Sequence, residues 1–337
     1  MHTIQEPIRI GVIGAGGMGT SHAMAMKTLH RARVVAVADS DEERGHKLAG
    51  AIAVPWFSDY NQMIEADEID AVSSASPPFL QKEMAITAAA GKHIFSEKQM
   101  SVNVADCEAM IQGAERAGDT LMVGQVLRFL MPFLKVRELV DSGAIGRPIA
   151  AAVTRLGGDG SVWMMPWRAR LKQSGGLLLE INAHEIDFLR SLGGDVASVY
   201  AEADNFLQPD ADYPDLAFVL LRFRNGGIGC RYSSNASPLT ETSGKVQGTE
   251  VTIRYNGWGK RGTIELQRMS DSQPTVFHLE AIEAPPGVAY ELDRFAEAVL
   301  TGAPPVVSGL DGLKVVEIGR AAYTSASERR PILLPTR

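Results

Sequence analysis

A glycine-rich segment near the start of the chain has the spacing found in nucleotide-binding turns. Residues 14–19 read G-x-G-x-x-G and directly follow an apolar run. Such a turn lets the backbone approach a pyrophosphate, and the following helix offers free N–H groups to phosphate. Asp39 lies 39 − 19 = 20 residues after the last glycine, where a carboxylate can accept hydrogen bonds from a ribose. The predicted dinucleotide-binding residues are Gly14, Gly16, Gly17, Met18, Gly19 and Asp39.

The residues after Asp39 bear on which dinucleotide would bind. Ser40 and Asp41 follow it, so a ribose 2′-phosphate would meet negative charge. NAD is therefore favoured over NADP, although Arg44 lies one helical turn away. The alternative interpretation of the segment is a structural glycine turn followed by an acidic residue.

The second segment of interest, residues 91–99, contains a lysine next to its last residue. Lys98 lies just after an apolar run that predicts a strand. In an open α/β sheet the carboxyl ends of the strands face the ligand crevice, so an ammonium group there could polarise a reacting oxygen. A solvated surface lysine is the alternative.

The third segment, residues 175–187, combines a glycine turn with a helical pattern. Glu180 and His184 are four residues apart and Asp187 follows three later, which predicts one helix face for all three. An imidazole titrates near pH 6.5, so a histidine flanked by carboxylates suits proton transfer. Two other interpretations remain open: a buried histidine satisfied by hydrogen bonds, and half of a metal site that lacks an evident third His or Cys ligand.

The elements that would position these residues fall into two groups. From residue 7 to residue 124, apolar runs alternate with helical patterns, which predicts a doubly wound parallel sheet with helices on both faces. The predicted strands are 8–13, 34–38, 70–74, 93–95 and 120–123. The predicted helices are 18–29, 41–49, 59–66, 80–90 and 104–117. We therefore expect a dinucleotide-binding domain over residues 1–124.

The remaining residues, 125–337, predict an α+β domain, because several strand patterns follow one another without crossover helices. The predicted strands are 149–155, 197–203, 216–223, 228–233, 251–255, 262–267 and 276–282. The predicted helices are 133–142, 177–192, 290–300 and 310–325. Residues 234–248 are rich in Ser, Thr and Gly, which predicts a loop.

Composition excludes several classes of protein. The 337 residues carry 33 Lys and Arg against 40 Asp and Glu, and a net charge of −7 disfavours nucleic acid and anionic membrane surfaces. No apolar run approaches the roughly 18 to 20 residues that span a bilayer. The two cysteines, Cys107 and Cys230, lie far apart in sequence, which favours a reducing compartment. We expect a soluble, cytoplasmic protein that binds neither nucleic acid nor membrane.

These segments, in this order, resemble the glucose-fructose oxidoreductase/inositol dehydrogenase/rhizopine catabolism family (Gfo/Idh/MocA). The resemblance implies a Rossmann domain followed by an α+β domain whose open, mostly antiparallel sheet forms a homodimer or homotetramer. It implies nicotinamide-dependent oxidation of sugars, polyols and related compounds. It assigns the catalytic lysine to Lys98 and the helix acid and histidine to Glu180 and His184, and it places Glu97 beside the cofactor.

The chain departs from the family pattern at three places. Gln99 stands where the family usually has proline, which adds a backbone N–H donor next to Lys98. Glu180 replaces the commoner aspartate and extends its reach by one methylene group. Ser76 and Pro77 are expected to shape the nicotinamide side of the cleft, with Gln81 as a polar substitute for the family's histidine.

Further candidates for substrate contact lie in the second half. Arg128 suits a carboxylate or phosphate, and the Trp167 ring could stack on a sugar. The candidates are Arg128, Trp163, Trp167, Arg168 and Asp187, and ordinary packing or solvation is the alternative for each. His22, on the first predicted helix, is expected to be structural.

These residues lead to one main hypothesis of function and two alternatives. His184 would take the hydroxyl proton of a sugar, inositol or related polyol while Lys98 polarises the oxygen and Glu180 holds His184 or a substrate hydroxyl. The alternatives are a redox-neutral enzyme that uses bound nicotinamide transiently, as in glycoside cleavage, and a nucleotide-binding regulatory protein without turnover. Retention of both Lys98 and His184 argues against the regulatory protein.

Overall fold

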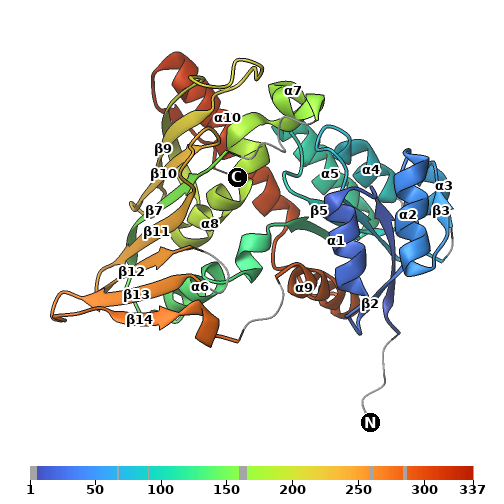
Figure 1. Ribbon diagram of the computed structural model, residues 1–337, viewed down its shortest axis with the longest axis horizontal. Helices are drawn as coiled ribbons and strands as arrows, with labels where there is room; N and C mark the ends of the chain where they lie inside the picture. The colour runs from blue at the N-terminus through green and yellow to red at the C-terminus, as the bar shows by residue number, and fades with distance from the viewer. Residues whose placement is uncertain are drawn as a thin grey trace, which may run out of the picture. The chain divides into compact units, whose positions relative to one another are not determined.

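The computed structural model describes residues 6–66, 68–89, 91–158, 165–257, 261–283 and 287–336 (Figure 1). The chain forms two compact units. The first consists of Met1–Val126 and Pro285–Lys314, and the second of Leu127–Ala284 and Val315–Arg337. The sequence-based division at residue 124 differs from this arrangement, because it leaves the later segment in the second domain.

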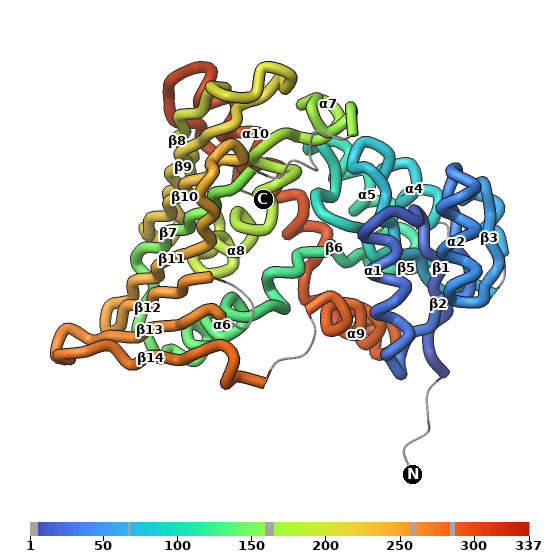
Figure 2. The backbone as a smooth tube through the Cα atoms, viewed as in Figure 1, coloured from blue at the N-terminus to red at the C-terminus, as the bar shows by residue number. Residues whose placement is uncertain are grey.

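Helix α9 (Gly287–Thr301) explains why that later segment groups with the first unit. It packs against α1 (Gly17–Met26), and Figure 2 shows the two helices side by side. The Phe295 ring of α9 lies 5.6 Å from the Phe95 ring, edge to face, and both rings are completely buried. Burial of two large aromatic side chains stabilises this association.

The first unit contains a six-stranded sheet in which every adjacent pair is parallel. Its order is β3-β2-β1-β4-β5-β6, which confirms the predicted doubly wound Rossmann fold. The strands are β1 (Ile8–Ile13), β2 (Ala32–Ala38), β3 (Trp56–Phe57), β4 (Ala71–Ser74), β5 (His93–Glu97) and β6 (Leu121–Gly124). The strand order reverses between β1 and β4, and such sheets bind ligands at the carboxyl ends of the strands on either side of that point.

Helices cover both faces of this sheet, and side chains fix where several of them begin. Besides α1 and α9 they are α2 (Glu42–Ile52), α3 (Tyr60–Ile64), α4 (Gln81–Ala88) and α5 (Val104–Ala117). The side chains of Asp41, Asp59 and Asn103 accept hydrogen bonds from N–H groups in the first turns of α2, α3 and α5. Gly118 ends α5 in the left-handed conformation.

The second unit contains a nine-stranded sheet in the order β14-β13-β12-β11-β7-β10-β9-β8-β15. Of the described strand pairs in this sheet, only β7 and β10 are parallel. This confirms the predicted, mostly antiparallel sheet. The strands are β7 (Pro148–Leu156), β8 (Val196–Asp204), β9 (Leu216–Phe223), β10 (Ile228–Ser234), β11 (Glu241–Gly248), β12 (Val251–Asn256), β13 (Thr263–Arg268), β14 (Thr275–His278) and β15 (Ile332–Leu333).

Two sequence-based expectations for this unit are wrong. Residues 234–248 are not all loop, because Glu241–Gly248 forms β11, hydrogen-bonded to β7 on one side and β12 on the other. The last predicted strand, 276–282, ends at His278 and continues as a short 3₁₀ turn, Leu279–Ala281.

The remaining helical segments include the one that carries His184. They are η1 (Val126–Phe129), α6 (Phe133–Asp141), η3 (Pro166–Ala169), α7 (Leu171–Ser174), η4 (Leu177–Ile181), α8 (Ala183–Gly193) and α10 (Gly309–Glu328). Helices α6 and α8 lie on one side of the large sheet (Figure 1). The core between them contains three aromatic rings packed edge to face, Phe133, Phe188 and Tyr255, with centroids 4.9 to 6.0 Å apart.

The other face of the large sheet is exposed along β9. Ala217, Val219 and Leu221 are buried, whereas the alternating residues Phe218 and Leu220 are each 48% exposed. This period of two is typical of a strand with one face in the core. No described helix is long and apolar enough to cross a membrane.

Candidate active site

The glycine turn has the geometry that a dinucleotide requires. Gly14 adopts φ +95°, and a Cβ on Gly19 would lie 1.7 Å from the Gly14 carbonyl oxygen, so both positions require glycine. A Cβ on Gly16 or Gly17 would have no neighbour within 4 Å, so a ligand can approach the backbone there. Helix α1 begins after Gly16 without a side-chain cap, which leaves N–H groups of its first turn for an anion.

Asp39 is held beside this turn at the end of β2. Its Oδ2 accepts a hydrogen bond of 2.6 Å from the Ala15 N–H, and its Oδ1 accepts one of 2.8 Å from Asp41. Arg44 Nε lies 3.0 Å from Asp41 Oδ2, and Arg44 Nη2 lies 3.7 Å from Asp39 Oδ1. Arg44 is therefore paired with both acids.

The loop after β4 adjoins the same turn. A Cβ on Gly14 would lie 2.9 Å from the Ala75 carbonyl oxygen and 3.3 Å from Ser76 Oγ. Gln81, completely buried, donates to the Ser76 carbonyl at 3.2 Å and accepts from Ser96. The structure thus brings Ser76, and Pro77 after it, to the glycine turn, while the Gln81 amide anchors their loop to β5.

Lys98 follows β5, and the side chain of the preceding residue, Glu97, holds its backbone. Its N–H donates to Glu97 Oε2 at 3.0 Å, and its side chain is partly exposed. The peptide bond between Lys98 and Gln99 is cis. On the other side of the carboxylate, His22 Nε2 lies 3.0 Å from Glu97 Oε1.

The segment of Glu180 and His184 differs from the single predicted helix over 177–192. Glu180 lies in the π-helical turn η4, whereas His184 is in the first turn of α8. Asn182 separates them with φ −120° and ψ 13°, which is not helical. The four-residue spacing of one regular helix therefore does not hold for this pair. Glu180 is buried and His184 is partly exposed.

A cation and a phenol surround Glu180. Arg168 Nε lies 3.4 Å from Glu180 Oε1, and the Arg168 guanidinium lies 5.1 Å from the centre of the Trp167 ring. Burial and the charge of Glu180 raise the pKa of Tyr213 to about 12. Tyr213 therefore stays protonated at neutral pH and can act as a hydrogen-bond donor.

The other predicted substrate contacts are arranged differently. Arg128 and Asp187 form a salt bridge with each other, and Asp187 is completely buried. Trp163 lies outside the described residues. Among the described residues no group of three His, Cys, Asp or Glu side chains could hold a metal ion.

Three buried polar residues were given no role at the site by the sequence patterns. His22, expected to be structural, contacts the Glu97 carboxylate. Arg231 of β10 is 1% exposed, and its inward position could have been detected from the alternation of Gly229, Arg231 and Ser233 along the strand. Tyr213 lies in a loop with no periodic pattern that would have indicated it.

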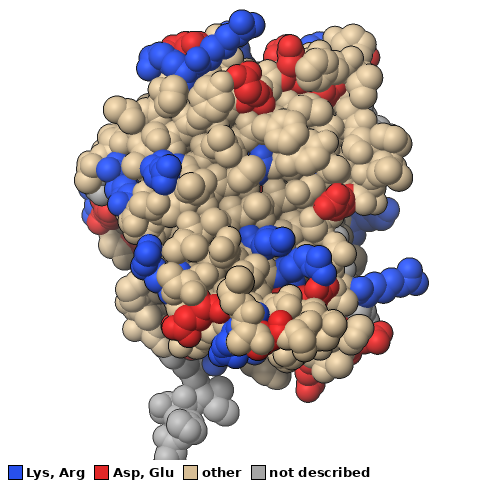
Figure 3. Space-filling model, turned by 90° about the vertical axis from the view of Figure 1, so that its left-hand side faces the viewer, with Lys and Arg blue, Asp and Glu red and all other residues tan. Residues whose placement is uncertain are grey.

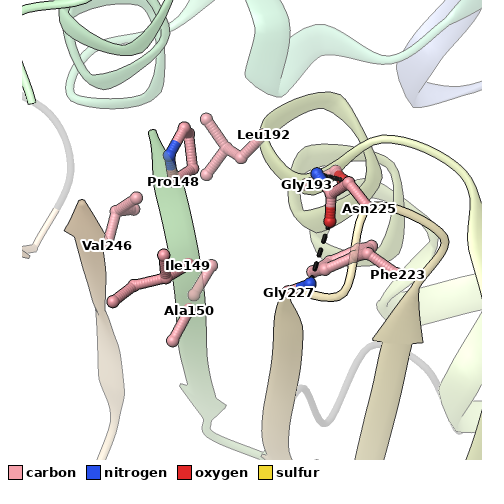
Figure 4. A pocket seen from close by; sticks show the side chains of 10 residues that line it. Pro148, Ile149, Ala150, Leu192, Gly193, Phe223, Asn225, Gly227 and Val246 are labelled. Atoms are coloured by element: carbon pink, nitrogen blue, oxygen red, sulfur yellow. Dashed lines mark hydrogen bonds between the residues drawn. The ribbon is translucent and has the colours of Figure 1, made fainter. Parts of the chain in front are cut away.

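The second unit also contains a small, mostly apolar pocket. It is lined by ten residues of β7, β11, the ends of α8 and β9, and the turn between β9 and β10, nine of which Figure 4 labels. The lining has no charged side chain.

Comparison with known proteins places this geometry in a family. Residues 8–125 match the model of an oxidoreductase family with an NAD-binding Rossmann fold, and residues 133–254 match the GFO/IDH/MocA C-terminal domain. Myo-inositol 2-dehydrogenase of Thermotoga maritima is 31% identical, covering 97% of this chain and 98% of the relative. NAD(+)-dependent scyllo-inositol 2-dehydrogenase of Bacillus subtilis is 28% identical, covering 98% and 97%.

A solved structure agrees over the whole length. Levoglucosan dehydrogenase in complex with NADH and levoglucosan superposes with a TM-score of 0.88 at 25% identity, covering 98% of this chain and 100% of that one. The chain belongs to the Gfo/Idh/MocA family of oxidoreductases. Its Rossmann domain is of the NAD-binding type.

Proposed function

We propose that this protein is an NAD-dependent dehydrogenase that oxidises a CH–OH group of a sugar, an inositol or a related polyol. The observation that carries the proposal is the open glycine turn before the uncapped helix α1, with Asp39 held beside it. The inositol dehydrogenases and the levoglucosan dehydrogenase among its relatives support this substrate class.

The cofactor would be held by the residues of the first unit. The backbone at Gly16 and Gly17 would approach the pyrophosphate, Asp39 would accept hydrogen bonds from the ribose, and Ser76 and Pro77 would border the nicotinamide. When bound, the nicotinamide accepts or supplies the hydride. NAD is preferred over NADP, because Arg44 is paired with Asp39 and Asp41 rather than available for a 2′-phosphate.

The chain's own residues handle the hydroxyl proton. His184 removes it during oxidation and returns it during reduction, as a general base and acid. Lys98 donates a hydrogen bond to the same oxygen and stabilises the negative charge that develops on it. Glu180, oriented by Arg168, holds His184 or a neighbouring substrate hydroxyl, and Trp167 offers a ring face to the sugar.

A substrate panel tests this function. The protein is mixed with NAD or NADP and with single sugars, inositols and hydroxy acids, while the absorbance of reduced nicotinamide is followed. We expect reduction of NAD with at least one polyol or sugar. Tight nucleotide binding with no reduction across the panel would contradict the proposal in favour of a regulatory protein. Product release without net change in NAD would instead identify the redox-neutral reaction.

The exposed face of the nine-stranded sheet is the proposed contact between copies of the chain. The Phe218 and Tyr232 rings stack there at 4.4 Å, and Leu220 and Ile228 are 48% and 44% exposed. Figure 3 shows this side of the molecule with few charged side chains near its centre. Light scattering should give a dimer or tetramer that Phe218→Glu dissociates and Leu239→Glu, in a loop, does not. A monomeric wild type would contradict this assignment.

A further inference from the structure

A completely buried histidine connects the helix of the glycine turn to the strand end that carries Lys98. His22 lies on α1, and its side chain has no exposed surface. Its Nε2 lies 3.0 Å from Glu97 Oε1, and its Nδ1 lies 2.9 Å from Ser73 Oγ on β4. One imidazole therefore joins α1, β4 and β5 of the first unit.

Both ring nitrogens of His22 and both carboxylate oxygens of Glu97 have a hydrogen-bond partner. Glu97 is 7% exposed, and a buried carboxylate is stable only when donors satisfy it. The Lys98 backbone N–H donates to Oε2. With Nε2 protonated, His22 donates to Oε1, and the Ser73 hydroxyl donates to Nδ1 in turn. Removal of the imidazole would leave Oε1 of Glu97 buried without this donor.

Packing leaves the Glu97 carboxylate little freedom to turn elsewhere. Gly124 pairs with Glu97 across β5 and β6, and a Cβ at Gly124 would lie 3.1 Å from Glu97 Oε1. The His22 ring packs edge to face on Phe95, with centroids 5.4 Å apart. Oε1 thus lies close to the Cα of Gly124, where a larger residue would crowd it, and the two hydrogen bonds to His22 and to the Lys98 amide set the orientation of the carboxylate.

We propose that His22 is a positioning residue for Lys98, acting through Glu97. It fixes the Glu97 carboxylate, which fixes the backbone of Lys98 at the end of β5. The proposal rests on the role of Lys98 proposed above. The same hydrogen bonds also link α1, the helix that starts at the glycine turn, to the strand end that carries the lysine.

Amide hydrogen exchange tests this coupling without any substrate. His22→Leu removes both ring nitrogens at similar volume, and His22→Gln restores a donor. We expect the Lys98 amide to exchange about tenfold faster in His22→Leu, whereas the Val12 amide of β1 keeps its wild-type rate. His22→Gln should stay within about threefold of wild type. An unchanged Lys98 amide in His22→Leu, or equal acceleration at Lys98 and Val12, would overturn the proposal.

A matched control comes from the other end of the same strand. His93 Nδ1 accepts a hydrogen bond of 2.9 Å from the Thr120 N–H. His93→Leu should accelerate exchange at Thr120 and leave Lys98 unchanged. Acceleration at Lys98 in this variant would show that loss of a histidine elsewhere in the first unit also loosens the end of β5, and would overturn the specific role of His22.

Turnover provides the second measurement. With the alcohol identified by the panel, His22→Leu should lower kcat about 10- to 100-fold while the Kd for NAD changes less than about threefold, and His22→Gln should recover most of the loss. Faster exchange at Lys98 with unchanged kcat would overturn the positioning role. If the wild type reduces no NAD, the proposed function fails, and the exchange result still decides whether His22 holds Lys98.

Discussion

Arg128 and Asp187 form a bidentate salt bridge that ties the start of the second unit to helix α8. Arg128 Nε donates to Asp187 Oδ2 at 2.7 Å, and Nη2 donates to Oδ1 at 2.6 Å. Asp187 is completely buried, and His184 lies one helical turn before it. The pair therefore supports the element that carries the proposed general base.

Loss of Arg128 should destabilise the protein strongly. Arg128→Met leaves a buried carboxylate without its guanidinium, and we expect the free energy of unfolding to fall by about 3 kcal/mol. The double variant Arg128→Met/Asp187→Leu should recover most of this loss, because no uncompensated charge remains. Urea denaturation of the three proteins measures the difference. Wild-type stability of Arg128→Met would show that the bridge contributes little.

Lys98 and His184 should each be required for turnover but not for folding. Lys98→Met and His184→Asn should lower kcat by about 10²- to 10³-fold, because each removes a group that we propose to act on the reacting oxygen. The Kd for NAD and the melting temperature should stay close to wild type. Steady-state kinetics with the identified alcohol measures the effect, and turnover comparable to wild type in either variant would remove that residue from the mechanism.

Asp39 should control nucleotide affinity. Asp39→Ser removes the carboxylate that we propose as the ribose acceptor, so the Kd for NAD should rise about tenfold. Asp41→Ser is the matched control, since serine retains the cap of α2 while one negative charge is lost, and it should leave the Kd within about threefold. Fluorescence titration with NAD checks both. Equal weakening by the two variants would mean that net charge, and not the ribose contact, sets the affinity.

Asp70 should make part of the stability of the first unit depend on pH. Hydrogen bonds from the Arg9 guanidinium, at 2.6 and 3.0 Å, lower the pKa of Asp70 below its usual value. The stabilisation is therefore fully present above the pKa of about 3.9 of an unfolded aspartate and is lost as pH falls through the lower, folded value.

Arg9→Met isolates this contribution. Its urea midpoint should be slightly below wild type at pH 7, a small effect because both side chains are partly exposed. The two midpoints should begin to converge below about pH 3.9 and should meet only below the lower, folded pKa of Asp70, where the carboxylate is protonated in folded wild type too. A difference between the two urea midpoints that stays constant down to low pH would show that packing of the arginine stem, and not the ion pair, causes it.

Arg231 should be dispensable for stability, whereas its neighbour Glu185 should not. Burial lowers the pKa of Arg231 to about 10, and none of its side-chain nitrogens has a hydrogen-bond partner among the described residues. Glu185 is completely buried and accepts a hydrogen bond of 2.8 Å from Arg155 Nη1. Arg231→Met should keep or raise the melting temperature, because Glu185 stays paired.

Glu185→Gln is the opposite case. It leaves Arg231 and Arg155 without the carboxylate between them, and we expect it to lose about 3 kcal/mol of stability. Thermal unfolding of both variants checks the contrast. Destabilisation of Arg231→Met as large as that of Glu185→Gln would show that the guanidinium stabilises the fold.

Local patterns predicted the elements of the fold better than the contacts between them. The bounds of β1, β9 and α5 agree with the prediction to the residue, because apolar periodicity and turn residues define these segments. Strand β11 escaped prediction because its Ser, Thr and Gly residues indicate a loop, while pairing with β7 and β12 makes it a strand. The break at Asn182 depends on backbone angles that side-chain spacing does not reveal.

The candidate site shows the same limit. The glycine turn and Lys98 are each marked by a short motif and were predicted from it. The partners of Arg128 and His22 lie 59 and 75 residues away in sequence, and only the folded chain brings these pairs together. Such long-range pairings decide which polar residues support the fold and which remain available to a ligand.

The division of the chain has a practical consequence for protein engineering. Helix α10 is shared between the units, with the boundary falling after Lys314. A chimera with a single crossover after residue 126 would separate α9 from α1. It would also lose the contact between Phe295 and Phe95. Recombination of substrate specificity in this scaffold should therefore use three crossovers, near residues 126, 285 and 314, so that Pro285–Lys314 stays with the nucleotide-binding part.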